Sequence, residues 1–234
     1  MQNKIKHVFF DLDHTLWDFE TNSRETLDEI HHRFELGERG MDLMKFIHAY
    51  EKVNSGMWAL YRENAITKEE LRDKRFQETL LEMGVVSKSL AHEISEYYLF
   101  NSPRKSNLFD HAHFVLDYLK SRYTLHIITN GFEEAQKIKL DRSNLNSYFT
   151  EVITSEQVGF RKPNRFIFDH ALNTTGANAS ESVMIGDDLE ADVLGAMNCG
   201  FEGVFFNPKE VPIGKDPKYD YKEINCLSEL RQIL

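Results

Sequence analysis

The sequence predicts an α/β fold in which a Rossmann-like, doubly wound parallel sheet forms the core and an all-helical domain is inserted into it. Short runs of apolar, β-forming residues recur along the chain, and helical patterns separate the last four of them. One long stretch near the N-terminus instead has several helical patterns and no clear strand. The length of 234 residues accommodates a core and a smaller second domain.

Strands are predicted where apolar runs are bounded by polar or turn-forming residues, at 7–10, 124–128, 151–153, 182–185 and 203–206. A helix is expected from Pro163 to about Gly176, because proline fits the first turn of a helix and glycine its end. Another is expected from Leu189 to about Gly200, since its apolar residues follow the i, i+4, i+7, i+8 spacing of one helix face.

Residues 17–100 are predicted to be the helical insertion, and residues 1–16 and 101–234 the catalytic core. Within the insertion, Thr67 and Glu70 have the spacing of a capping box, in which each side chain binds the backbone N–H of the other residue. The first strand precedes the insertion and the other strands follow it, so the core is discontinuous in sequence.

The composition is that of a folded protein, and it excludes two classes of partner. Hydrophobic residues make up 41% of the chain, and 38 Asp and Glu against 28 Lys and Arg give a net charge of −10, which repels polymeric nucleic acid. No apolar run approaches the roughly 18 residues that cross a membrane, and Asp11 interrupts the first run, which argues against a signal peptide. Cys199 and Cys226 are too few for a disulfide framework, so reduced thiols in a cytoplasmic protein are expected.

Polar residues follow three of the predicted strands at the points where the strands end. In an open parallel sheet these carboxyl ends lie at one edge, where ligands bind. A lysine on the loop after the third strand joins them, and together they are expected to form one site. The residues are Asp11, Asp13 and Thr15 after the first strand, Thr129, Asn130 and Gly131 after the second, Lys162 on the loop, and Gly186, Asp187 and Asp188 after the fourth.

The spacing of Asp11, Asp13 and Thr15 also occurs in calcium-binding loops and in ordinary acidic turns. A calcium loop between two helices requires glycine at its sixth position and glutamate at its twelfth, where this chain has Leu16 and Asn22. An ordinary turn would leave two carboxylates together at a strand end for no purpose. The polar residues after the second and fourth strands and on the Lys162 loop favour a phosphate site over both alternatives.

In their order and spacing, these motifs resemble the four motifs of the haloacid dehalogenase-like hydrolase superfamily over essentially the whole chain. The helical insertion is similar in position to the mobile cap of the phosphoglycolate phosphatase and haloacid dehalogenase branches. Residues 128–163, especially 129–132 and 155–159, are most similar to the house-cleaning pyrimidine 5′-nucleotidases.

Carboxylate chemistry and the resemblance imply the same catalytic roles. Asp11 is expected to attack phosphorus and form an aspartyl-phosphate, which divides a difficult hydrolysis into two steps. Asp13 is expected to protonate the leaving alkoxide and then to take a proton from the attacking water. Dehalogenases proper lack this second aspartate, because a halide needs no acid, so Asp13 favours a phosphatase.

A phosphate group needs positive charge and hydrogen-bond donors in a site that holds several carboxylates. The Thr129 hydroxyl and a backbone N–H of Asn130 or Gly131 are expected to bind it, and Lys162 would steady it. The resemblance implies Mg²⁺ as the cofactor. The ligands it implies are the Asp11 carboxylate, the main-chain carbonyl of Asp13, the Asp187 carboxylate and a phosphate oxygen.

The second acid of the fourth motif is open between two residues. Asp192, which follows Asp187 on the next helix, is preferred for this position. Asp188 would then either bind Mg²⁺ through water or cap that helix. Thr15 and Gly131 complete their own motifs as supporting residues.

Trp17 and Phe19 immediately follow the first motif, where the core continues into the insertion. Aromatic rings can stack on a nucleobase, so both are candidate substrate-specificity residues. Core packing is the commoner use of the aromatic residues that lie further inside the insertion.

The sequence thus predicts a Mg²⁺-dependent phosphomonoesterase for small phosphorylated metabolites, with pyrimidine nucleoside 5′-monophosphates favoured. A sugar-phosphate or phosphoglycolate phosphatase, or a phosphoglucomutase-like transferase, would use the same core. A catalytically silent phosphate-binding module is disfavoured, because Asp11, Asp13, Lys162 and Asp187 are all present. A monomer or a weak homo-oligomer is expected.

Overall fold

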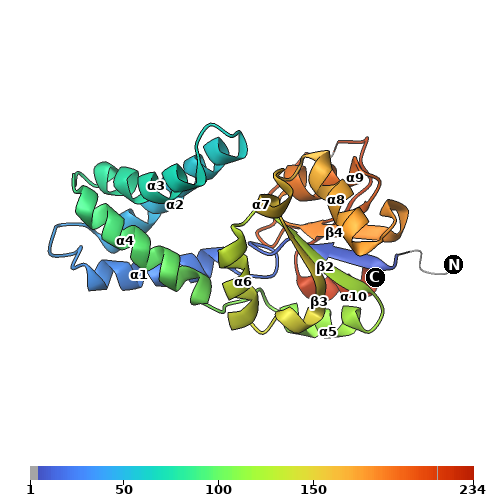
Figure 1. Cartoon of the computed structure of the whole chain (residues 1–234). Helices are drawn as coiled ribbons and strands as arrows, with labels where there is room; N and C mark the ends of the chain where they lie inside the picture. Colours follow the sequence, from blue (N-terminus) through green and yellow to red (C-terminus); the bar gives the residue numbers. More distant parts are fainter. Residues whose placement is uncertain (1–4, 215) are drawn as a thin grey trace. The chain divides into compact units, whose positions relative to one another are not determined.

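A computed structural model describes residues 5–214 and 216–234 of the chain (Figure 1). It divides into two compact units. One contains the chain up to Phe19 together with Ser106–Leu234, and the other is Glu20–Lys105. None of the helices in the described part of the chain is both long enough and apolar enough to cross a membrane.

The first unit is built on a six-stranded parallel sheet with the order β3-β2-β1-β4-β5-β6. The order reverses at β1, which lies between β2 and β4, so the carboxyl ends of these three strands meet at a topological switch point. The strands are β1 (His7–Phe10), β2 (Thr124–Thr129), β3 (Phe149–Thr154), β4 (Ser182–Gly186), β5 (Glu202–Phe206) and β6 (Lys222–Ile224).

All five predicted strands are confirmed, and the predicted fold class with them. The sixth, β6, has three residues, of which two are exposed and charged. It carries neither an apolar run nor a clear alternation, and it forms because its backbone completes the edge of the sheet beside β5.

Helices cover both faces of this sheet, because its strands are apolar on both sides (Figure 1). Val8 and Phe10 face one layer, in which they pack with α5 (Ala112–Lys120) and the C-terminal α10 (Leu230–Ile233). Phe9 faces the opposite layer, with α8 (Arg165–Thr175). The remaining core helices are α6 (Glu133–Arg142), α7 (Ser155–Val158) and α9 (Gly195–Met197).

Two helices differ from the prediction, one in its first residue and one in its type. The helix expected at Pro163 begins at Arg165, because the Asn164 side chain accepts a hydrogen bond from the Phe166 N–H and caps it. The segment expected to be an α-helix from Leu189 is instead a π-helical turn, Leu189–Leu194, followed by α9. Both kinds of turn place similar apolar residues inward, so the spacing alone did not distinguish them.

Four helices form the second unit: α1 (Phe19–Arg33), α2 (Leu43–Arg62), α3 (Lys68–Glu82) and α4 (Lys88–Asn101). Leu27, Phe46 and Phe76 contribute to its own apolar core. The predicted capping box of Thr67 and Glu70 is present at the start of α3. The unit begins at Glu20 and ends at Lys105, where residues 17 and 100 were expected.

Candidate active site

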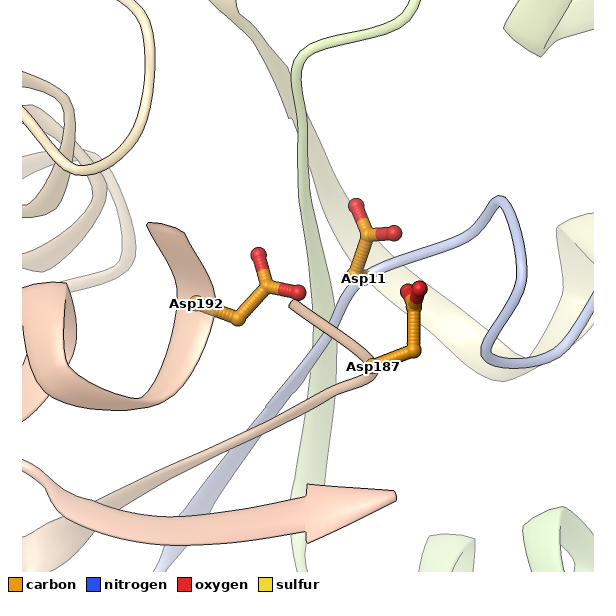
Figure 2. A group of neighbouring side chains, drawn as sticks. All are labelled: Asp11, Asp187 and Asp192. Carbon is orange, nitrogen blue, oxygen red and sulfur yellow. The ribbon is translucent and has the colours of Figure 1, made fainter. Parts of the chain in front are cut away.

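Three carboxylates gather at the carboxyl edge of the sheet (Figure 2). Asp11 follows β1, Asp187 follows β4, and Asp192 lies on the π-helical turn after β4. One oxygen from each carboxylate lies within 4.8 Å of the others. Like charges this close repel one another, so the group requires cations as partners.

Lys162 is the cation that the fold itself supplies to this group. Its Nζ lies 2.6 Å from Asp11 Oδ1 and 2.6 Å from Asp192 Oδ1, and it also donates to the carbonyl of Ile128. Burial alone would lower the pKa of Lys162, but the two carboxylates outweigh it and raise this pKa above its ordinary value. The ammonium is therefore held charged beside Asp11.

The loop that carries Lys162 is fixed by Asn130. The Asn130 side chain accepts a hydrogen bond from the Lys162 N–H at 2.8 Å and donates one to the Lys162 carbonyl at 3.0 Å. These bonds occupy both ends of the Asn130 amide, so its side chain anchors the loop that carries Lys162.

Asp188 and Asp192 have separate positions. Asp188 Oδ1 accepts hydrogen bonds from the N–H groups of Glu190 and Ala191 and so caps the π-helical turn. The Asp192 carboxylate turns back into the cluster, where Oδ2 accepts from the Asp188 N–H and Oδ1 meets Lys162. Burial and the charge of Asp11, opposed by Lys162, raise the pKa of Asp192 to about 7.

Asp187 is the carboxylate of this group that makes no direct ion pair among the described residues. Thr15 connects it to the first motif: the Thr15 hydroxyl donates to Asp187 Oδ1 at 3.1 Å and accepts from the Asp187 N–H at 3.1 Å. Burial first, and then the charges of Asp192 and Asp11, raise the pKa of Asp187 well above its ordinary value. Hard carboxylate oxygens in such a group are the donors that Mg²⁺ prefers, so the residues present fit that ion.

Asp13 is held by two side chains of α6 that the sequence analysis did not identify. Lys139 Nζ lies 2.5 Å from Asp13 Oδ1, and Gln136 Nε2 donates to Asp13 Oδ2 at 2.8 Å. Burial alone would raise the pKa of Asp13, but the charge of Lys139 and these hydrogen bonds hold it below its ordinary value. Their signal in the sequence is a glutamine and a lysine three residues apart, which face one side of the helix that follows Thr129.

The Thr129 hydroxyl accepts from the Gly131 N–H at 3.0 Å and from Gln136 Nε2 at 3.1 Å. A hydroxyl has two lone pairs and one proton. Because both lone pairs have partners, the proton is available to a ligand oxygen, which is what a phosphate-binding threonine requires.

The proposed substrate role of Trp17 is not supported by its position. Its side chain is completely buried and belongs to the apolar core of the first unit. Its ring and that of Phe19 lie 4.4 Å and 5.6 Å from Lys139 Nζ, measured to the ring centroids. Trp17 follows the first motif along the chain, but its ring is buried in the core, where it contacts Lys139.

Comparisons with known proteins identify the family of this chain. The profile of the haloacid dehalogenase-like hydrolase family matches residues 5–200. The chain is 31% identical over 230 residues to pyrimidine 5′-nucleotidase YjjG of Escherichia coli strain K12, covering 97% of this chain and 96% of that protein. It is 31% identical over 206 residues to pyrimidine 5′-nucleotidase PynA of Streptococcus pneumoniae, with coverage of 87% and 84%.

A crystal structure of the HAD-hydrolase YfnB from Bacillus subtilis, described as bound to magnesium, superposes with a TM-score of 0.85. The two chains are 26% identical, and 98% of each is covered. The fold of this chain is therefore shared over almost its whole length with a magnesium-binding relative.

Proposed function

This chain belongs to the haloacid dehalogenase-like hydrolase family, and from that premise we propose that it is a Mg²⁺-dependent phosphatase that hydrolyses pyrimidine nucleoside 5′-monophosphates. The assignment as a phosphatase rests on Asp13. A second carboxyl group two residues after the nucleophile serves a leaving group that needs a proton, as an alkoxide does and a halide does not. The two pyrimidine 5′-nucleotidases with 31% identity support the substrate class.

The reaction begins with Asp11. One oxygen of its carboxylate attacks the phosphorus atom, and the bond from phosphorus to the ester oxygen breaks. Lys139 and Gln136 favour the ionised form of Asp13 in the free site, so Asp13 takes up a proton when the negatively charged phosphate group enters beside it, and it gives that proton to the departing oxygen. The nucleoside leaves, and an aspartyl-phosphate remains. Lys162 pairs with the Asp11 carboxylate and counters negative charge as the phosphoryl group approaches.

Water completes the cycle. Asp13, now a carboxylate, removes a proton from a water molecule whose oxygen attacks phosphorus, and the bond from phosphorus to Asp11 breaks. Inorganic phosphate leaves, and both aspartates regain their starting states. Thr129, with its hydroxyl proton available, and the backbone N–H groups that follow it would bind the phosphoryl oxygens throughout.

Asp11 and Asp187 are the carboxylates that would hold Mg²⁺, together with the carbonyl oxygen of Asp13. When bound, the ion would neutralise charge on the phosphoryl group and on the carboxylates around it. Asp192 contributes differently: its two oxygens bind Lys162 and the backbone of Asp188, so its role is to orient the lysine.

A panel of phosphate esters tests this proposal, with released phosphate measured in the presence of Mg²⁺. We expect kcat/KM to be highest for uridine, deoxyuridine and thymidine 5′-monophosphates, and lower for purine nucleotides, phosphoglycolate, hexose phosphates and N-acylneuraminate 9-phosphate. If kcat/KM for a non-pyrimidine ester exceeded that for every pyrimidine nucleotide tenfold, about 1.4 kcal/mol in transition-state binding, the nucleotidase assignment would be wrong.

A further inference from the structure

Both oxygens of the Asp13 carboxylate are bound by side chains from one helix, α6. Lys139 holds Oδ1, and Gln136 holds Oδ2 while its Nε2 also reaches the Thr129 hydroxyl. We infer that Gln136 and Lys139 are positioning residues that fix the direction of the Asp13 carboxylate for proton transfer. This inference rests on the phosphatase function proposed above.

Lys139 is enclosed by the fold on the side away from Asp13. Its side chain is 7% exposed, and its ammonium faces the rings of Trp17 and Phe19. An aromatic face attracts a cation but accepts no ordinary hydrogen bond, so the directional partner of this ammonium is the carboxylate of Asp13. Burying an ammonium is costly unless it is paired, which ties Lys139 to Asp13.

Gly131 provides the space through which Gln136 reaches Asp13. A Cβ atom at this position would lie closer than 3.0 Å to the end of the Gln136 side chain and 3.2 Å from Asp13 Oδ2. Any larger residue would therefore push Gln136 away. The second motif thus contributes the space that the Gln136 side chain occupies, in addition to the Thr129 hydroxyl.

Each of the two carboxylates proposed to react has a buried lysine of its own. Lys162 binds Asp11 and Lys139 binds Asp13, so the two ion pairs form separate networks. A proton donor must stay within hydrogen-bond distance of the atom it serves. A carboxylate free to rotate would lose that direction, and α6 prevents the rotation by holding both oxygens.

Lys139→Met tests the inference, with Lys137→Met on the exposed side of the same helix as the matched control. Two substrates separate proton transfer from phosphate binding: the best alkyl phosphate of the panel, whose alkoxide needs a proton, and p-nitrophenyl phosphate, whose phenolate leaves without one. We expect Lys139→Met to lower kcat for the alkyl phosphate about 100-fold. The burst of p-nitrophenolate should change by less than about threefold, and KM should change little.

An Asp13→Asn background provides the second measurement. Because a positioning residue acts only through Asp13, adding Lys139→Met to Asp13→Asn should cause no further loss. Gln136→Leu should repeat the pattern of Lys139→Met with a smaller loss, and it carries the same test if Lys139→Met does not fold. Equal losses on both substrates, an additive loss in the Asp13→Asn background, or unchanged alkyl phosphate turnover would each overturn the inference. A wild-type protein that releases phosphate from neither substrate would instead refute the proposed function.

Discussion

Gly186→Ala should disrupt the active site from a position that contacts no substrate. Gly186 ends β4, and a Cβ atom there would lie 2.5 Å from the Cβ of Asp192, below the 3.0 Å that real Cβ contacts respect. Asp192 cannot yield easily, because its carboxylate binds Lys162 at 2.6 Å and the Asp188 N–H at 3.1 Å. The added methyl group must therefore separate Asp192 from Lys162.

Breaking a buried ion pair costs about 3 kcal/mol or more. For a chain of this size, each kcal/mol lowers the melting temperature by about 2–4 °C, so Gly186→Ala should lower Tm by about 6–12 °C. Activity should fall as well, because Lys162 loses one of the two carboxylates that orient it.

Thermal unfolding and phosphate release measure both effects, and Gly56→Ala is the matched control. Gly56 lies within α2, is exposed, and a Cβ atom there would meet nothing within 4 Å. Since alanine is the better helix former, this control should be neutral or up to about 1 kcal/mol more stable. A Gly186→Ala protein with wild-type Tm and wild-type turnover would refute the packing argument.

Three further predictions concern the metal, a buried histidine and a buried tryptophan. Chelation should abolish phosphate release, Mg²⁺ should restore it and Ca²⁺ should inhibit it, because Ca²⁺ favours a larger and looser ligand shell; full activity in excess chelator would contradict this. Burial first, and then the charge of His7, lower the pKa of His126 to about 4. The unfolded chain therefore binds more protons between about pH 6.5 and 4, so stability falls as the pH falls through this window, by about 2 kcal/mol between pH 8 and 5. Urea unfolding of wild type and His126→Gln at pH 8 and pH 5 measures this loss of stability. If the two proteins lost the same amount, burial of His126 would not be its cause. Trp17→Ala should lower the unfolding free energy by about 3–5 kcal/mol, since the ring is buried. It should not change the preference among nucleobases. A changed base preference in kcat/KM would support a substrate role for Trp17.

The sheet could be predicted because its central strands are short, apolar and bounded by motif residues. Val8 and Phe10 face one layer and Phe9 the other, and this two-sided burial leaves a continuous apolar run in the sequence. The strand Lys222–Ile224 left no such run, because it lies at the edge of the sheet and two of its three residues are exposed.

The residues that pair with the predicted site were harder to find. A lysine and a glutamine on a mostly polar helix normally face water, so their three-residue spacing alone did not mark Lys139 and Gln136 as buried. Trp17 was misinterpreted for a related reason. Adjacency to the first motif shows where a residue lies along the chain, but the direction of its ring depends on the turn that Thr15 and Leu16 make into the core.

The most direct measurement of the central claim compares wild type with Asp11→Asn, using uridine 5′-monophosphate and Mg²⁺. Asparagine is nearly isosteric with aspartate, but its amide is a poor nucleophile, so the variant should fold and release no phosphate above background. Its thermal unfolding curve checks that the fold is intact. Wild type should release phosphate and, after rapid acid quenching, carry a phosphoryl group that the variant lacks. Near-normal phosphate release by a folded Asp11→Asn protein would contradict the aspartyl-phosphate mechanism.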